Sequence, residues 1–177
     1  MVDYSSDYTR VVCAMMQYGD EILLKRRTKP PFKGMLCMPG GKVKKKETPR
    51  TALYREILEE TGLTPKGTYL AGEFVEIVSE EDTTYRNLIL AYFVEPENFN
   101  YLPSTEEGEN VALRYYDLTN PENAMRKEVA PWDLRFIDGA DTRRANALNR
   151  QFCVQKVGGK YRVLGESQAG FKRFAHT

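Results

Sequence analysis

The chain has 177 residues, of which 41% are hydrophobic, 11% aromatic and 29% charged. This length and composition suit one folded domain and exclude disordered, collagen-like and disulfide-framework proteins. The 26 basic residues nearly balance the 25 acidic ones, for a formal net charge of +1, which excludes a global field favouring nonspecific nucleic-acid or membrane binding.

The first elements are predicted to be buried strands joined by a tight turn. Residues 11–16 form a continuous apolar run, residues 18–20 interrupt it, and residues 21–25 resume it. After two consecutive prolines, residues 35–38 predict a short strand that ends at the turn Pro39-Gly40-Gly41.

A helix of about thirteen residues is expected next. Thr48 is a suitable cap, Pro49 suits the first helical position, and Gly62 suits the end. Apolar residues mark one face of this helix, and charged residues mark another. The apolar set is Ala52, Leu53, Ile57 and Leu58, and the charged set is Arg55, Glu56, Glu59 and Glu60.

The remaining chain alternates between strand and helix patterns. Strands are predicted at 68–78, 85–94 and 112–118, helices at 122–129 and 131–149, and a terminal hairpin at 152–157 and 161–164. We therefore expect an α/β domain over residues 1–150, with residues 151–177 forming a hairpin extension packed on the same domain.

Three carboxylates on the first helix point to metal chemistry. Glu56, Glu59 and Glu60 lie at positions i, i+3 and i+4, within one turn on one face. Glu59 and Glu60 fall in the last turn, where the helix dipole disfavours negative charge. A solvated helix face is one interpretation, and binding of Mg²⁺, which takes oxygen ligands and shares them with substrate phosphates, is the other.

A basic segment precedes this acidic helix. Residues 25–46 contain nine lysines and arginines and no aspartate or glutamate, and the turn at Gly40 and Gly41 allows close approach to the backbone. A basic loop beside an acidic helix favours a phosphate-bearing substrate.

These residues resemble the Nudix box of the nucleoside diphosphate-X hydrolases. The pattern starts at Gly41, continues at Glu47 and ends with residues 55–63, Arg-Glu-Ile-Leu-Glu-Glu-Thr-Gly-Leu, which fills every fixed position of the 23-residue motif. Residues 21–27 and 38–42 also resemble the flanking strand and turn of MutT-type members, and the likeness covers residues 9–138. The resemblance implies an α/β/α sandwich with a mixed sheet, and hydrolysis of a diphosphate linkage by water.

The resemblance also implies roles for individual residues. Glu56 would bind metal and orient or deprotonate the attacking water, and Arg55 would hold a box glutamate by an ion pair. Glu56, Arg55 and Glu59 are thus the implied catalytic residues. The implied metal ligands are Gly40, Gly41, Glu47, Glu56, Glu59, Glu60 and Glu109.

Glu109 is chosen from an acidic loop that also contains Glu106 and Glu107, because of its offset from Tyr115; a solvated loop is the alternative. On the substrate side, Arg27 matches a phosphate-contacting arginine, and Lys42 lies in the turn into the box.

Three further residues are candidates for contact with the base. Met38 matches a base-packing position, and Trp132 could stack on a purine while Asp133 reads its edge. For Met38 and Trp132, packing in the core is the alternative interpretation.

The expected reaction is conversion of a nucleoside or deoxynucleoside triphosphate to its monophosphate and pyrophosphate, as in MutT-like enzymes, with Mg²⁺ or Mn²⁺. The proline found past the box in ADP-ribose hydrolases is missing, since Val78 and Ser79 fill that stretch, and so is the Ser-Gln-Pro-Trp-Pro-Phe-Pro signature of NADH hydrolases. An ADP-ribose or nucleotide-sugar pyrophosphatase, and a non-catalytic nucleotide or RNA-end binder, are the alternatives.

Cysteine spacing and the polar N-terminus indicate the cellular setting. Cys13, Cys37 and Cys153 suit neither a disulfide framework nor a zinc site. No signal peptide or apolar stretch of ~18 residues is apparent. We therefore expect a cytoplasmic monomer or homodimer that binds a nucleotide, with neither a membrane nor nucleic acid as partner.

Overall fold

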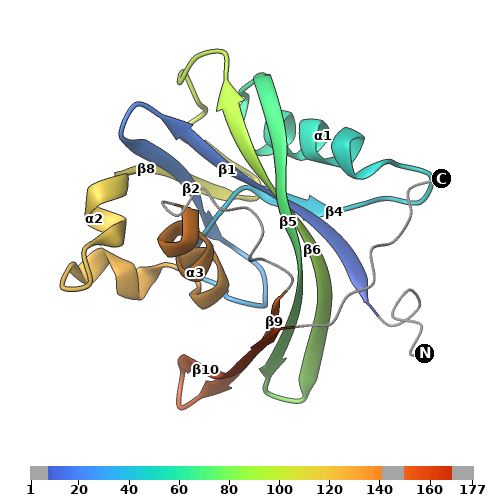
Figure 1. Ribbon diagram of the computed structural model, residues 1–177, viewed down its shortest axis with the longest axis vertical. Helices are drawn as coiled ribbons and strands as arrows, with labels where there is room; N and C mark the ends of the chain where they lie inside the picture. Colours follow the sequence, from blue (N-terminus) through green and yellow to red (C-terminus); the bar gives the residue numbers. More distant parts are fainter. Residues whose placement is uncertain (1–7, 141–149, 169–177) are drawn as a thin grey trace.

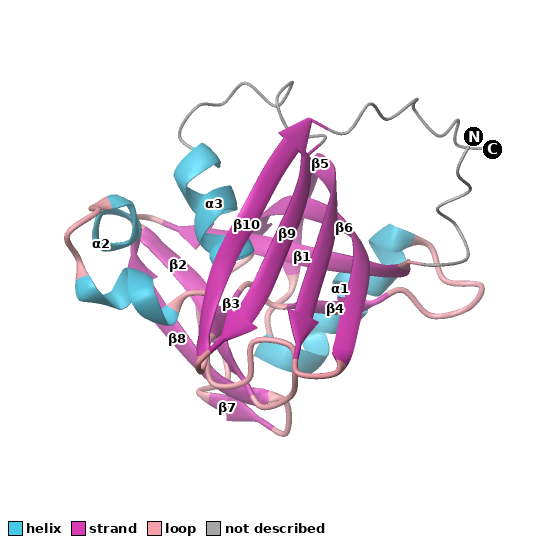
Figure 2. Cartoon of the chain, turned by 90° about the horizontal axis from the view of Figure 1, so that it is seen from below, coloured by secondary structure: helices cyan, strands magenta, loops and turns pink. Residues whose placement is uncertain are grey.

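The computed structural model describes residues 8–140 and 150–168. In these residues, ten strands form one mixed sheet with helices on both faces (Figures 1 and 2). The strand order is β10-β9-β5-β6-β1-β2-β8-β7, with β3 paired to β2 and β4 to β1. The predicted α/β/α sandwich with a mixed sheet is therefore confirmed.

The bounds of the elements follow the chain. The strands are β1 (Thr9–Tyr18), β2 (Glu21–Arg27), β3 (Leu36–Cys37), β4 (Gly40–Lys42), β5 (Pro65–Glu80), β6 (Thr83–Pro96), β7 (Ser104–Thr105), β8 (Gly108–Arg114), β9 (Arg150–Val157) and β10 (Lys160–Gln168). The helices are α1 (Pro49–Thr61), α2 (Tyr115–Thr119), the 3₁₀ helix η1 (Ala124–Glu128) and α3 (Pro131–Ala140).

The central strand β1 supplies both hydrophobic cores because its side chains alternate between the two faces of the sheet. Val12, Ala14 and Met16 pack with α1, whereas Cys13 and Met15 pack on the α3 side. The continuous apolar run in this strand therefore reflects burial on both faces.

Helix α1 has the ends that its sequence predicts. The Thr48 side chain accepts a hydrogen bond from the Thr51 amide, and Gly62 closes the helix in the left-handed conformation with φ of 71°. Ala52, Leu53 and Ile57 are buried against the sheet. The opposite edge of the helix is thereby left to its charged residues.

Helix α3 covers the other face. Trp132, Phe136 and Ile137 pack against Phe74 of β5 in the second core. The helical pattern predicted for 131–149 is described only to Ala140, and residues 141–149 lie outside the described part.

Two predicted elements differ in the structure. The strand expected at 112–118 ends at Arg114, and helix α2 begins at Tyr115, which lets Leu118 pack in the core on the α3 side. The helix expected at 122–129 is the short 3₁₀ helix η1, which the Asn123 side chain caps by accepting from Met125.

The C-terminal hairpin is confirmed and extends the sheet. Gly158 and Gly159 form its turn with positive φ, and β9 lies beside β5 and runs parallel to it (Figure 1). In their register, Phe74 pairs with Arg150. The division of the chain at residue 150 stays a prediction. Among the described residues, none of the helices has the length and apolar character needed to span a bilayer.

Candidate active site

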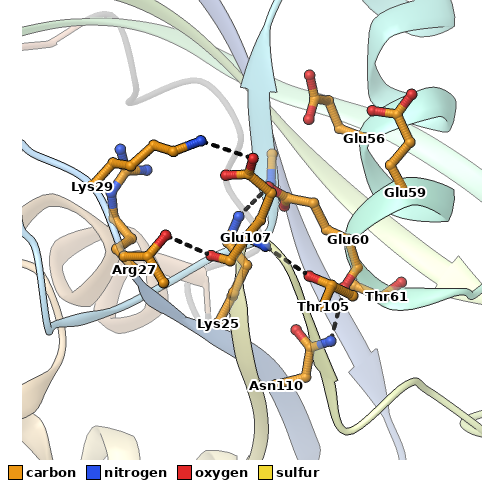
Figure 3. A network of polar contacts seen from close by, with 12 residues as sticks. Lys25, Arg27, Lys29, Glu56, Glu59, Glu60, Thr61, Thr105, Glu107 and Asn110 are labelled. Carbon is orange, nitrogen blue, oxygen red and sulfur yellow. Dashed lines mark hydrogen bonds and ion pairs between the residues drawn. The ribbon is translucent and has the colours of Figure 1, made fainter.

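The last two turns of α1 present the three predicted carboxylates toward β2 and the loop before β8 (Figure 3). Their environments differ strongly. The Glu59 side chain is 56% exposed and that of Glu56 is 13% exposed, whereas the Glu60 side chain is only 4% exposed. Glu60 is therefore the buried member of these three carboxylates.

Glu60 forms an ion pair with Lys25, a buried residue of β2, and accepts a hydrogen bond from the Gly40 amide at 2.8 Å. Burial raises the pKa of Glu60, while the Lys25 ammonium and the Gly40 amide oppose this rise. Because a buried charge needs a partner, Lys25 and Glu60 depend on each other.

Arg55 joins the remaining carboxylates of the box. Its guanidinium binds Glu47 through two bonds of 2.8 and 2.9 Å and also reaches Glu56 at 2.5 Å and Glu59 at 3.2 Å. This pairing lowers the pKa of Glu47 to about 2. The planar fork of arginine suits this arrangement, which is the ion-pair role that the resemblance implies.

The turn before α1 requires glycine at two positions because the backbone passes close to other groups. A Cβ on Gly40, whose φ is 153°, would lie 2.1 Å from the Val12 carbonyl oxygen. A Cβ on Gly41 would lie 2.5 Å from the Glu56 carboxylate. Gly41 thus leaves the space that the Glu56 carboxylate occupies.

A divalent cation fits the chemistry of this donor set, since carboxylate oxygens are the ligands that Mg²⁺ and Mn²⁺ prefer. Within residues 8–140 and 150–168, however, no three acidic, histidine or cysteine side chains are gathered as a metal site. Arg55 and Lys25 hold the carboxylates instead. A bound cation would therefore take over part of the neutralisation that these two side chains now supply.

The acidic loop between β7 and β8 places Glu107, rather than Glu109, near the basic residues of the site (Figure 3). Glu107 pairs with Lys29 at 3.0 Å, and the positive charges of Lys29, Lys25 and Arg27 lower its pKa.

The metal-ligand role expected for Glu109 stays a prediction, and the β2–β8 register does not favour it. Glu109 lies opposite Arg26 in the β2–β8 register, and their side chains are 3.8 Å apart. The next pair, Lys25 and Asn110, points to the α1 face, where Asn110 donates to the Glu60 carbonyl oxygen at 2.8 Å. Because side chains alternate along a strand, Glu109 faces away from α1.

A second group of buried carboxyls lies on the α3 side. Asp133, in the first turn of α3, accepts a hydrogen bond from the Met38 amide at 2.7 Å, and Glu76 of β5 accepts one from Asn87 at 2.9 Å. Burial raises the pKa of Asp133 to about 7 and also raises that of Glu76. The charge of Arg27 acts on both carboxyls.

Trp132 and Met38 lie in the hydrophobic core, which agrees with the alternative interpretation of these two residues as core side chains. Trp132 is 3% exposed, and its indole stacks on Phe136 with ring centroids 5.6 Å apart. Met38 is 4% exposed in the same cluster. Lys42 is exposed, and its carbonyl oxygen accepts a bond from Arg55 at 3.1 Å. The structure thus gives Trp132 a packing role rather than an open stacking surface.

Sequence reasoning missed Lys25 and Glu76 as individual site residues. Lys25 follows Leu23, and Glu76 follows Phe74, each two positions along a strand and therefore on the same buried face. The sequence signal for both residues is a charged side chain at a core-facing position of an otherwise apolar strand.

A mixed sheet between two helical layers, with an acidic helix beside a basic strand, is an α/β/α sandwich whose charged groups suit a phosphate-bearing ligand and a cation. The family model described as NUDIX domain matches residues 7–139. The chain therefore belongs to the Nudix family and is a Nudix pyrophosphohydrolase, and members of this family generally depend on a divalent metal.

Two curated proteins share sequence with the chain. An ADP-ribose pyrophosphatase from Methanocaldococcus jannaschii is 44% identical over 63 residues, which span 36% of this chain and only 37% of that enzyme. The uncharacterized Nudix hydrolase YvcI from Bacillus subtilis is 28% identical over 129 residues, 73% of this chain and 77% of YvcI.

Solved structures share the fold. A MutT protein from Bacillus halodurans has a TM-score of 0.66 at 19% identity and covers 90% of this chain and 96% of its own. The Nudix domain of Shewanella oneidensis NrtR, solved with ADP ribose, has a TM-score of 0.63 at 18% identity, with 80% and 94% covered. At these identities the likeness concerns the fold.

Proposed function

We propose that the protein converts a nucleoside or deoxynucleoside triphosphate to its monophosphate and pyrophosphate, with Mg²⁺ as the natural cation and Mn²⁺ as a substitute. The observation that carries this proposal is a line of polar groups across the molecule. It runs from Glu60 of α1, which binds Lys25 and the Gly40 amide, along the turn between β3 and β4 to Asp133, which binds the Met38 amide. The charges of Glu76 and Arg27 act on Asp133. This line has a phosphate-binding end and an end suited to a base.

At the phosphate end, Glu56, Glu59 and Glu60 would hold the cation, which neutralises charge on the phosphoryl oxygens. Glu56 orients and deprotonates the attacking water. Arg55 fixes the direction of the Glu56 carboxylate, to which it donates at 2.5 Å. We assign Arg27 to a substrate phosphate because it lies on β2, the strand that also carries Lys25, the partner of Glu60.

The loop carboxylate nearest to these groups is Glu107, and we propose it, in place of Glu109, as the additional acidic residue of the site. Its pairing with Lys29 and its electrostatic contact with Lys25 and Arg27 support this choice. Before substrate binds, these three cationic side chains stabilise the negative charge of Glu107. When substrate binds, its phosphate oxygens can replace the Glu107 carboxylate as their partner.

At the other end, Asp133 and Glu76 read the base. Asp133 accepts a hydrogen bond from the Met38 amide through Oδ1, and Glu76 accepts one from Asn87 through Oε2. A neutral carboxyl can donate as well as accept a hydrogen bond. Such a pair suits the mixed donor and acceptor edge of a purine.

An ADP-ribose pyrophosphatase activity is the second candidate. It is favoured by the 44% identity to the Methanocaldococcus jannaschii enzyme, although the match spans 37% of that protein. The two candidates share the phosphate end of the site and differ in what lies beyond the second phosphate. We place the protein in the cytoplasm, as a monomer or homodimer.

A substrate panel tests the proposal. Nucleoside triphosphates, oxidised dGTP, ADP-ribose, nucleotide sugars and dinucleoside polyphosphates are incubated with Mg²⁺ and then with Mn²⁺, and the products are separated by chromatography. We expect a triphosphate to yield monophosphate and pyrophosphate. Cleavage of ADP-ribose alone would favour the second candidate, and tight binding without cleavage of any compound would refute both.

A further inference from the structure

The C-terminal hairpin lies outside the matched range 7–139 but contacts the loop that follows β2. The Tyr161 hydroxyl of β10 accepts a hydrogen bond from the Phe32 amide at 2.8 Å and donates one to Glu80 at 2.9 Å. The rings of Phe32 and Tyr161 also pack together, with centroids 4.7 Å apart. One side chain of the hairpin therefore holds both the backbone and the ring of Phe32.

The same loop fixes Arg27 through three hydrogen bonds. The Arg27 amide donates to the Met35 carbonyl at 2.9 Å, and the Gly34 amide donates to the Arg27 carbonyl at 2.8 Å. The Arg27 side chain donates from Nε to the Pro31 carbonyl at 2.9 Å. The direction of the guanidinium thus depends on the placement of the residue just before Phe32.

The contact of Tyr161 with this loop is supported from the sheet. Lys156 of β9 pairs with Glu80 of β5 and places its ammonium 5.5 Å from the centre of the Tyr161 ring. Val154 and Val78 pack with Phe32 in a small apolar cluster. Phe32 itself has a φ of 64°, a conformation that a bulky side chain keeps only when its surroundings hold it.

We propose that Tyr161 is a positioning residue for substrate binding, which acts by holding the loop 28–35 so that Arg27 is aligned with a substrate phosphate. The C-terminal hairpin then contributes to substrate binding indirectly, through the loop that it holds in place. This inference rests on the proposed phosphate-binding role of Arg27.

The variant Tyr161→Phe tests this role because it keeps the ring but removes the hydroxyl. Tyr69→Phe is the matched control, since Tyr69 is 59% exposed on β5. Calorimetry with inorganic pyrophosphate and Mg²⁺ measures phosphate binding without need of turnover. We expect Tyr161→Phe to weaken this binding about tenfold, the equivalent of one good hydrogen bond, and Tyr69→Phe to leave it unchanged.

Two further readouts separate positioning from simple stabilisation. With dGTP, or with ADP-ribose if that is the substrate, KM should rise about tenfold in Tyr161→Phe while kcat stays within about twofold. Hydrogen exchange at the Phe32 amide should accelerate. In an Arg27→Ala background the Tyr161→Phe change should have no further effect on pyrophosphate affinity, because the two residues act as one unit.

Unchanged pyrophosphate affinity in a folded Tyr161→Phe protein would overturn the proposal, and so would additive losses in the double variant. The outcome is distinct from that of the proposed function. If the wild-type protein cleaves no nucleotide but Tyr161→Phe still weakens pyrophosphate binding through Arg27, the proposed reaction fails and the positioning role stands.

Discussion

The carboxylates of Glu60 and Asp133 are held by backbone amides only two residues apart. The Gly40 amide donates to Glu60 at 2.8 Å, and the Met38 amide donates to Asp133 at 2.7 Å. The short turn between β3 and β4 therefore connects the acidic helix α1 on one face of the sheet with α3 on the other. Any shift of this turn moves the two ends of the site together.

Glu59 and Glu60 should respond differently to loss of charge. Glu59→Gln should lower kcat about 100-fold or more with Tm nearly unchanged, because this exposed side chain serves the cation. Glu60→Gln should also inactivate the enzyme but cost about 3–5 kcal/mol in the free energy of unfolding, because Lys25 is left without its buried partner. Steady-state kinetics and urea unfolding measure the two effects.

The double variant Lys25→Met/Glu60→Gln is the control for this difference. It should recover much of the lost stability without recovering activity, since it removes the unpaired ammonium but not the need for the carboxylate. Near-wild-type turnover of both single variants would contradict the metal-binding assignment.

Gly41→Ala should impair catalysis through the Glu56 carboxylate. The new Cβ would meet this carboxylate at 2.5 Å and displace it, and a displacement of about 1 Å at a reacting group costs roughly 100-fold in rate. Gly139→Ala in α3 is the control, because a Cβ there has no neighbour within 4 Å. Full activity in Gly41→Ala, measured as kcat/KM, would show that Glu56 need not keep its position.

Arg55→Lys should lower kcat/KM by roughly 10- to 100-fold while the helix remains folded. A lysine keeps the charge but cannot bind Glu47 through two bonds and reach Glu56 at the same time. The pKa of Glu47, now held at about 2 by Arg55, should move toward its ordinary value. Carboxyl-carbon NMR titration measures that shift, and an unmoved titration would contradict the assigned contact.

Glu107→Gln and Glu109→Gln form a matched pair that tests the revised loop assignment. We expect the first to lower kcat by about tenfold or more and the second to have an effect of less than about twofold, because only Glu107 lies among the cations of the site. The opposite order would restore Glu109 as the loop carboxylate.

Asp133→Asn should change how stability depends on pH. In the wild-type protein the folded-state pKa of about 7 lies above the ordinary value of 3.8, so the folded state binds more protons between these pH values. The contribution of Asp133 to stability should therefore be greatest below about pH 4, decrease as the pH rises to about 7, and then level off. Burial, the nearby Glu76, the Met38 amide and Arg27 together set this pKa.

The Asp133→Asn variant removes this titration but keeps an oxygen for the Met38 amide. Relative to the wild type, it should gain stability on going from pH 4 to pH 8, by at most roughly 4 kcal/mol, since one pKa unit corresponds to about 1.4 kcal/mol. Urea unfolding at both pH values measures the difference. Parallel pH profiles for the two proteins would contradict the raised pKa.

The sequence was sufficient to predict features that depend on local chemistry. Helix α1 follows from Thr48, Pro49 and Gly62, since capping and termination need only neighbouring residues. By contrast, Tyr115–Thr119 carries strand-forming residues but is helical, with Leu118 buried against residues of distant elements. Local propensity could not reveal that competing contact.

The limits of the site prediction have a similar origin. Spacing favours Glu109, whereas the β2–β8 register places Glu109 opposite Arg26 and away from α1, and register depends on long-range pairing. Trp132 was expected near a base, yet its place depends on Phe74 of a distant strand. The residues of the Nudix box could be predicted from the sequence as a set. Their cationic partners on β2 could be identified only from the fold.

The ion pair between Lys25 and Glu60 means that the resting enzyme carries its own internal counterion. We therefore expect the chain to fold without Mg²⁺. Exhaustive treatment with EDTA should silence the enzyme while the protein stays folded, with an unfolding temperature that falls only by the amount that ion binding contributes, and re-addition of the ion should revive it without a refolding lag.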